Sequence, residues 1–497
     1  MLEELVKERR RKLETLRRAG IDPYPPRVAR THAVGGALAD FAALAGKGAE
    51  VALAGRLRSL RDQGKIIFAD LEDGSGKIQV VLKEDSLAGG GLDFWRSVLD
   101  IGDFVAAAGK LFTTQRGEKS LEAARLTMAA KSLLPLPDKW AGVEDEELRL
   151  RKRYLDLIAT PELRELFRKK TAFWESFRDG LKREGFTEVE TPVLESTPGG
   201  AEAEPFKTRH RALGEDFYLR ISLELPLKRL IVGGYDKVFE IGRVFRNEGI
   251  DREHLQDYTQ LEFYWAYRDY NDTMALTEKL YKDAIAKTCD GLVTEHDGEK
   301  IDWSGKWPKI DYLDAFKKAT GLDLATASRE DLLDKAAGLD LAADETLGKG
   351  RLIDLIYKKT VRPHLVEPCF LVDPPVEIEP LAKRKPENPR VVERFQIMAA
   401  GTELGKGFSE LNDPDDQRAR FEEQMRLRAA GDREAQMLDE DFVEALSYGM
   451  PPAGGFGVSE RFFAVLMDRP IRECVFFPLM RTEKGGDKDK GRTRSAQ

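Results

Sequence analysis

The stretch from Val238 to Tyr267 constrains the fold of this chain more than any other. Its apolar and polar residues alternate on both sides of a central glycine, and a period of two predicts two strands joined by a loop. One face of this predicted hairpin is an apolar core. The other face collects an arginine, carboxylates and phenols: Arg246, Glu248, Tyr258, Glu262 and Tyr264. The pattern alone fits a binding site and equally a solvated strand face with satisfied ion pairs.

Composition limits the class of protein. At 497 residues the chain can form two or three domains around large cores. Hydrophobic residues make up 41% and charged residues 34% of it, and no apolar run reaches the roughly 20 residues that a membrane span needs. The N-terminus lacks the apolar segment of a secretory signal, and the three cysteines are too far apart to suggest a disulfide framework or a zinc site. We therefore expect a cytoplasmic protein without membrane association.

The run FRNEG, from Phe245 to Gly249, resembles motif 2 of the class II aminoacyl-tRNA synthetases. The surrounding sequence resembles the lysyl-tRNA synthetase family, which belongs to subclass b. The motif 2 arginine of that family, here Arg246, holds the ATP α-phosphate and the amino-acid carboxylate, which suits a permanently charged, forked guanidinium. The resemblance also places Glu248 and His254 near the ATP, and Tyr258 where an aromatic ring stacks on adenine.

The N-terminal third predicts a small β-domain. Residues 1–30 read as a basic helix with an extension, and residues 31–132 contain five short strands with a hairpin turn at Asp73 and Gly74. Five such strands suggest a closed barrel of OB type, although a small sandwich would give a similar pattern. The family resemblance supports the barrel and implies that it grips the tRNA anticodon. By that resemblance Arg58, Phe68 and Gln79 stack on and hydrogen-bond the anticodon bases.

Residues 133–150 are proline-spaced and predict a linker to a catalytic domain at residues 151–481. We expect an α+β fold there, with an antiparallel sheet flanked by helices. A predicted helix between Pro161 and Gly185, followed by a strand ending at Pro192, resembles motif 1, which implies a homodimer. Residues from about 270 to 390 predict a mostly helical insertion without a catalytic constellation. Residues 482–497 predict a disordered tail.

The resemblance also assigns an amino-acid pocket. It implies that Gly200 and Glu224 contact the α-amino group and that Glu410 receives the ε-ammonium of lysine. The remaining expected lysine-binding residues are Glu262, Tyr264 and Phe408. The expected magnesium ligands are Glu403, Glu410 and Gln396, which would hold the metal together with ATP phosphates. Plain strand alternation would put Glu403 and Glu410 on opposite faces, so we expect a β-bulge near Gly405 or Gly407.

A strand running into a helix near residues 448–468 resembles motif 3. Ser459 predicts an N-cap, and the resemblance implies that Arg461 meets the γ-phosphate of ATP. The chain has one residue fewer than the usual pattern between Pro452 and Arg461, and Glu460 stands at the usual aspartate. Because of this deletion, the sequence does not determine the register of the strand or where the helix begins relative to the usual motif 3 pattern.

Two further departures from the family pattern fall in the pocket. Gln396 replaces a carboxylate seven residues before Glu403, which predicts weaker metal binding. Lys406 replaces an asparagine beside the substrate amine, and a second ammonium there should repel the substrate unless it turns away or pairs with a carboxylate.

The resemblance implies an ATP-dependent lysine–tRNA ligase, which forms lysyl-adenylate and transfers lysine to the 3′ end of tRNA(Lys). Three alternatives stay open on the sequence. The first is a subclass b enzyme for aspartate or asparagine, against which the acidic pocket argues. The second ligates lysine to a protein, but such relatives lack the barrel. The third is a catalytically altered protein that only binds tRNA.

Overall fold

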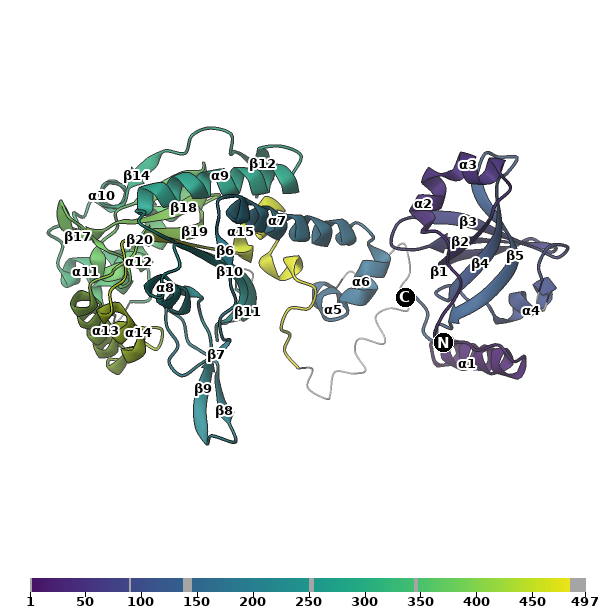
Figure 1. Cartoon of the computed structure of the whole chain (residues 1–497), viewed down its shortest axis with the longest axis horizontal. Helices are drawn as coiled ribbons and strands as arrows, with labels where there is room; N and C mark the ends of the chain where they lie inside the picture. Colours follow the sequence, from purple (N-terminus) through teal and green to yellow (C-terminus); the bar gives the residue numbers. More distant parts are fainter. Residues whose placement is uncertain (1, 89–90, 137–144, 250–253, 344–346, 483–497) are drawn as a thin grey trace. The chain divides into compact units, whose positions relative to one another are not determined.

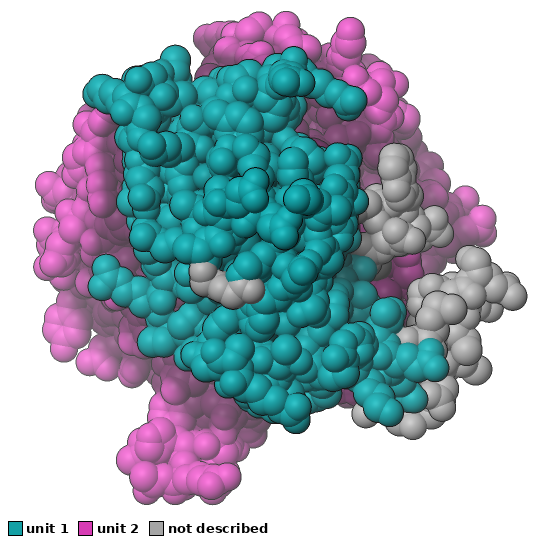
Figure 2. Space-filling view, turned by 90° about the vertical axis from the view of Figure 1, so that its right-hand side faces the viewer, with its two compact units in different colours: residues 1–144 teal, residues 145–497 magenta. Residues whose placement is uncertain are grey.

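We analysed a computed structural model of the chain, which describes residues 2–88, 91–136, 145–249, 254–343 and 347–482. The chain divides into two units, residues 1–144 and 145–497 (Figure 2). This division falls within the predicted linker 133–150. The linker residues 137–144, and all of the predicted disordered tail except residue 482, lie outside the described residues.

The first unit begins with the predicted helix, α1 (Leu2–Arg18), which ends before Gly20 in the left-handed region at φ 72°. Leu13 and Leu16 are buried, whereas Leu2 and Leu5 are exposed. Only the C-terminal half of the apolar stripe therefore packs on the barrel. The other helices of this unit are α2 (Val34–Ala39), α3 (Phe41–Gly46) and α4 (Gly91–Val98).

Five strands of the first unit close into a barrel in the order β1-β2-β3-β5-β4 (Figure 1). All neighbours are antiparallel except β3 and β5. The predicted turn joins β2 to β3, where the Asp73 amide donates to the Gly76 carbonyl at 3.0 Å. The OB-type prediction is confirmed. The strands are β1 (Glu50–Asp62), β2 (Ile66–Glu72), β3 (Lys77–Lys83), β4 (Phe104–Thr113) and β5 (Lys119–Ala130).

The second unit is built on an eight-stranded sheet in the order β14-β15-β18-β19-β20-β11-β10-β6. Its strands pair antiparallel except at the two edges, where β14–β15 and β10–β6 are parallel. The α+β prediction of an antiparallel sheet flanked by helices is confirmed. The strands are β6 (Thr187–Glu188), β10 (Lys237–Phe245), β11 (Asp257–Ala266), β14 (Lys309–Asp311), β15 (Cys369–Val372), β18 (Arg394–Ala399), β19 (Thr402–Ser409) and β20 (Ala453–Ser459).

The predicted hairpin is the pair β10–β11, whose register places Glu240 opposite Glu262. Helices α7, α9 and α15 cover one face of the sheet, with Phe239 and Phe263 in the shared core. Helices α8, α13 and α14 pack on the other face around Val238 and Tyr264. Because both faces are covered, a solvated strand face is excluded. These helices are α7 (Leu163–Arg183), α8 (Glu224–Val232), α9 (Tyr270–Thr288), α13 (Pro414–Ala429), α14 (Glu440–Ser447) and α15 (Glu460–Leu466).

Two segments differ from their predicted secondary structure. The strand expected to end at Pro192 is reduced to the two residues of β6, and the chain pairs again only at β7 (Leu194–Glu195). The segment from about 270 to 390 contains helices but also β14 and β15, which extend the main sheet. Its helices after α9 are α10 (Tyr312–Thr320), α11 (Arg329–Gly338) and α12 (Lys349–Thr360).

The remaining elements are short. Helices α5 (Glu146–Arg151) and α6 (Arg153–Ala159) precede α7. The small sheets outside the main one are formed by β8 (Lys207–His210) and β9 (Glu215–Leu219) with β7, by β12 (Val293–His296) with β13 (Glu299–Asp302), and by β16 (Arg384–Lys385) with β17 (Asn388–Val392). Within the described ranges, we find no helix with the length and apolar character of a membrane span.

Candidate active site

The second unit contains a cavity of about 860 Å³. Its walls come from the loop before α8, from the middle of the sheet, and from the segments around α12 and β16. Every residue of this unit that the sequence predicts for ATP, lysine or magnesium lines it. They are Gly200, Glu224, Arg246, Glu248, His254, Tyr258, Glu262, Tyr264, Gln396, Glu403, Phe408, Glu410 and Arg461.

At one end of the cavity lies Arg246, directly after β10. Its backbone amide donates to the Gln256 carbonyl at 2.8 Å, and its Nε donates to the Ile221 carbonyl at 3.3 Å. The guanidinium carbon lies 5.6 Å from the centre of the Tyr258 ring, close enough for a cation–π contact. The predicted phosphate ligand and the predicted adenine platform are therefore neighbours.

The shortened motif 3 keeps a regular geometry. Strand β20 pairs with β11 without a register shift from Ala453 to Ser459, so the missing residue does not disturb the ladder. Ser459 Oγ accepts from the Arg461 amide at 3.4 Å and caps α15, as predicted. Glu460 is buried and accepts from the Thr259 amide at 2.9 Å and from Lys170 Nζ at 2.8 Å. These contacts fix the first turn that carries Arg461.

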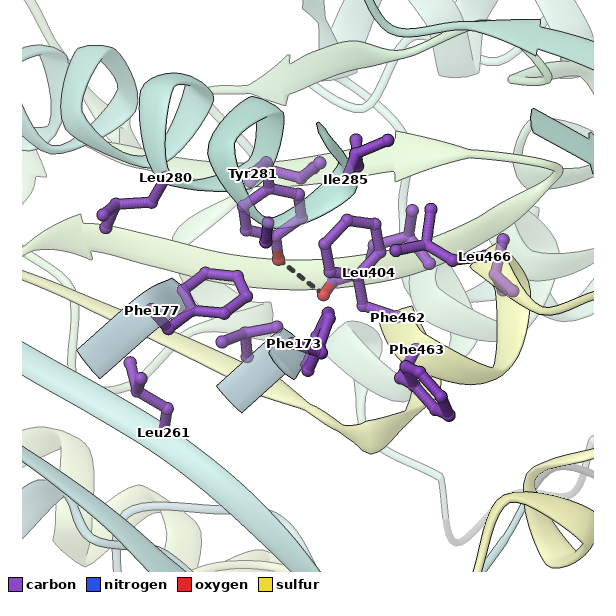
Figure 3. Close-up of a cluster of buried hydrophobic side chains, with 14 of the residues drawn as sticks. Phe173, Phe177, Leu261, Leu280, Tyr281, Ile285, Leu404, Phe462, Phe463 and Leu466 are labelled. Carbon is purple, nitrogen blue, oxygen red and sulfur yellow. Dashed lines mark hydrogen bonds between the residues drawn. The ribbon is translucent and has the colours of Figure 1, made fainter. Parts of the chain in front are cut away.

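The bulge expected near Gly405 is present in β19. Ile397 of β18 pairs with Gly405 and Met398 pairs with Glu403, so Leu404 is the extra residue. Tyr281 of α9 donates from its hydroxyl to the Leu404 carbonyl at 2.8 Å (Figure 3). The bulge turns Glu403 to the cavity that Glu410 also lines.

Three buried carboxylates line the cavity: Glu224, Glu262 and Glu410. Glu262 accepts from neutral donors, including the Ser222 hydroxyl at 2.8 Å, the Leu223 amide at 3.0 Å and the Tyr264 hydroxyl at 2.8 Å. Burial raises the pKa of Glu224 and of Glu410, because desolvation penalises the charged form.

Lys228, one turn after Glu224 on α8, pairs with two of these carboxylates. Its ammonium lies 2.6 Å from Glu224 Oε1 and is in direct contact with Glu410 Oε2. Burial acts to lower the pKa of Lys228, but the ion pairs with Glu224 and Glu410 outweigh it and raise the pKa. Within the described residues, Lys228 is the cation in ion-pair contact with Glu224 and Glu410.

Two glycines make room for these carboxylates. Gly200 has φ 83°, and a Cβ on it would come within 2.9 Å of the Glu224 side chain. Glycine at this position therefore lets the backbone approach the Glu224 side chain closely. A Cβ on Gly455 of β20 would collide with Glu410 Oε1.

Lys406 pairs with a carboxylate, which the sequence analysis gave as one way to accommodate it. Its Nζ donates to Glu379 Oε2 at 2.9 Å, and Arg394 Nε lies 3.6 Å from the same oxygen. Burial alone would raise the pKa of Glu379, but Lys406 and Arg394 outweigh it and lower the pKa. The ammonium of Lys406 is therefore neutralised within the protein.

Gln396 and Glu403 adjoin each other in the cavity, and the Gln396 amide donates to Glu403 Oε2. One carboxylate and one amide provide oxygen donors of the kind that Mg²⁺ shares with nucleotide phosphates, so the two residues fit such an ion. Glu410 fits poorly as a metal ligand, because its carboxylate already contacts the Lys228 ammonium.

In the barrel unit, Arg58, Phe68 and Gln79 come from β1, β2 and β3. Arg58 lies at a register shift between Leu57 and Ser59, and its Nε is 3.0 Å from Glu72 Oε2. Phe68 and Gln79 are half-buried and alternate with core residues of their strands. Phe68 and Gln79 therefore occupy outward-facing positions of adjacent strands, whereas Arg58 is buried against Glu72.

Lys228 and Glu379 are among the charged residues of the site that were not predicted. The sequence offers a signal for Lys228, because it follows Glu224 by four residues on a helix whose other residues, apart from Arg229, are apolar. Glu379 lies in the segment expected to hold no catalytic residues, yet it lines the cavity. Arg351 of α12 also lines it, pairing with Glu202 at 3.2 Å and Asp432 at 3.1 Å.

An antiparallel sheet that brings two arginines and several carboxylates to one cavity, together with an OB-type barrel, defines a class II aminoacyl-tRNA synthetase. The sequence model of the family described as tRNA synthetases class II (D, K and N) matches residues 145–481. That of the OB-fold nucleic acid binding domain matches residues 51–129.

Curated relatives narrow this class. A lysine–tRNA ligase of Moorella thermoacetica is 47% identical over 97% of this chain and 98% of its own length. Lysine–tRNA ligases of Roseiflexus sp. (strain RS-1) and Pelotomaculum thermopropionicum are 46% and 44% identical, each over 97% of this chain and over 99% and 95% of their own lengths. The chain belongs to the lysine–tRNA ligase family of class II synthetases.

Proposed function

We propose that this protein activates L-lysine with ATP and transfers it to the 3′ end of tRNA(Lys). The first step forms lysyl-adenylate and releases pyrophosphate. The second step transfers the lysyl group to a terminal hydroxyl of the tRNA and releases AMP. Family membership supports the reaction class, and the cavity supports the choice of amino acid.

The net charge of the part of the cavity that would bind the amino acid favours lysine as the substrate. Glu224, Glu262 and Glu410, when ionised, carry three negative charges, and the contacting Lys228 supplies one positive charge. A ligand with two ammonium groups neutralises the two negative charges that Lys228 leaves unbalanced. Lysine has one ammonium group at the α-carbon and one at the end of its side chain. Aspartate would add a negative charge, and asparagine would leave one uncompensated.

The chemistry requires positioning more than proton transfer. The lysine carboxylate is already a nucleophile at neutral pH and attacks the α-phosphorus as pyrophosphate leaves. Arg246 holds the α-phosphate and this carboxylate, and Arg461 holds the far end of the triphosphate. Glu248 and His254 contact the nucleotide, and Tyr258 stacks on adenine. Gly200, Tyr264 and Phe408 shape the lysine end. A magnesium ion held by Glu403 and Gln396 would supply additional positive charge for the phosphates.

The barrel provides the tRNA specificity in this proposal. Arg58, Phe68 and Gln79 bind the unstacked anticodon bases by stacking and hydrogen bonding. The active form is a homodimer, as the resemblance of residues 161–192 to motif 1 implies, and the enzyme acts in the cytoplasm.

The test is amino-acid-dependent exchange of pyrophosphate into ATP, with all twenty amino acids assayed in parallel on the purified protein with magnesium. We expect exchange with lysine. Exchange with a different amino acid would retain the class and overturn the substrate. A folded protein that supports no exchange with any of them would overturn the activity itself.

A further inference from the structure

Lys228 is a buried charged residue of the site, and the proposed function uses only its charge. Its side chain has no exposed surface, and it does not line the cavity, whereas its partners Glu224 and Glu410 do. Its ammonium also lies 5.2 Å from the Phe408 ring and 5.9 Å from the Phe442 ring, so aromatic rings enclose it. It therefore holds the two carboxylates from within the protein and cannot be replaced there by solvent ions.

We propose that Lys228 is a positioning residue that determines specificity for a diamino acid, by fixing Glu224 and Glu410 as a pair of charged receptors. This inference rests on the proposed function. Without a cation between them, the two buried carboxylates would repel each other and move from their positions beside Lys228. They would then no longer receive two ammonium groups of one substrate together, and the preference for such a substrate would fall.

The free oxygen of Glu410 supports this role. Glu410 is 1% exposed, its Oε2 contacts Lys228, and its buried Oε1 accepts no hydrogen bond from the described residues. A buried carboxylate oxygen without a donor is costly unless a ligand supplies one. Lys228 thus orients one oxygen of Glu410 and leaves the other for the ligand.

The experiment compares Lys228→Met with the wild type in steady-state pyrophosphate exchange. We expect the KM for lysine to rise by roughly tenfold or more, as for loss of a hydrogen bond to a charged group, with kcat and the KM for ATP little changed. The preference for lysine over norleucine, which lacks the ε-ammonium, should fall by a similar factor. Lys228→Arg retains the positive charge and should restore much of the preference.

The barrel offers a matched control. Lys131 is also a fully buried lysine between two carboxylates, with Nζ 2.6 Å from Asp100 and 2.8 Å from Asp103. Lys131→Met and Lys228→Met should both lower the melting temperature, but Lys131→Met should leave the KM for lysine and the preference over norleucine unchanged. Should Lys228→Met fail to fold, Lys228→Gln, which keeps hydrogen-bond donors without the charge, provides the same comparison.

The outcomes separate the two proposals. If the wild type shows no lysine-dependent exchange, the proposed function is wrong. If the wild type is active but the uncharged variants keep its KM for lysine and its preference over norleucine, the role of Lys228 is wrong and the function stands.

Discussion

Tyr281 donates a hydrogen bond of 2.8 Å to the backbone carbonyl of Leu404, the extra residue in the bulge of β19. The tyrosine is fully buried among aromatic side chains of α7 and α15 (Figure 3). Burial, and then the charge of Glu403, raise the pKa of its hydroxyl well above the usual range, so it remains a donor. The bond secures the bulge that brings Glu403 and Glu410 to one cavity.

Tyr281→Phe removes this donor. We expect the free energy of unfolding to fall by about 1–3 kcal/mol, because a buried carbonyl loses its partner. We also expect the KM for ATP to rise, since Glu403 adjoins the bulge, with a smaller effect on the KM for lysine. Denaturant unfolding measures the free energy of unfolding, and pyrophosphate-exchange kinetics measure the two KM values. Tyr312→Phe is the control, because the buried Tyr312 hydroxyl bonds to none of the described residues and its loss should cost little.

Gln396→Glu places a second carboxylate beside Glu403. We expect the magnesium concentration for half-maximal exchange to fall severalfold, because two carboxylates attract the ion more strongly than one. Without magnesium the variant should melt at a lower temperature than the wild type, since like charges adjoin in a half-buried site. Titration of exchange activity with magnesium and thermal melts with and without magnesium check the prediction. An unchanged magnesium requirement would contradict the proposed ion site.

Lys406→Asn leaves Glu379 buried, with the more distant Arg394 as its remaining ion-pair partner among the described residues. We expect a loss of about 1–3 kcal/mol in the free energy of unfolding, as for a buried charged group that loses a partner. The double variant Lys406→Asn with Glu379→Gln should lose less than the two single losses together, because both charges are gone. Denaturant unfolding of the four proteins gives the coupling. Additive losses would show that the two residues act independently.

The carboxyl group of Glu195 should make the stability of the folded protein depend on pH. Burial, and then the charge of Asp439, raise its pKa to about 8, and its Oε2 accepts no hydrogen bond from the described residues. The folded protein holds this proton more tightly than the unfolded chain, so the stabilisation is complete below pH 4.5 and is lost as pH rises toward 8. Glu195→Gln stays neutral, and its melting temperature should exceed that of the wild type increasingly over this range.

Thermal melts from pH 5 to pH 9 measure the effect. The control is Glu440→Gln, whose exposed carboxylate pairs with Arg418. That variant should show no gain that grows with pH. A constant difference between Glu195→Gln and the wild type across the range would contradict the raised pKa.

Local patterns predicted much of this protein. The alternation in β10 and β11, the turn at Asp73 and the serine cap of α15 each depend on residues within a few positions of one another, so the sequence reveals them directly. The family motifs, which are equally local, predicted the residues that line the cavity. The alternation of side chains along a strand also predicted a bulge in β19, because Glu403 and Glu410 would otherwise point to opposite faces of the sheet.

Other features depended on the tertiary structure. The short β6 and the strands at the edge of the main sheet are set by pairing with partners far away in sequence, which no local pattern records. The identity of Leu404 as the bulged residue is set by its pairing with β18.

The sequence by itself determined which residues we propose for binding ATP, lysine and tRNA, because the family motifs are recognised from residue type and spacing. The tertiary structure alone decided how the buried charges are balanced, as between Lys406 and Glu379 or between Lys228 and Glu410. Each pair joins segments separated along the chain, and a buried charge is tolerated only where folding brings a counter-charge to it.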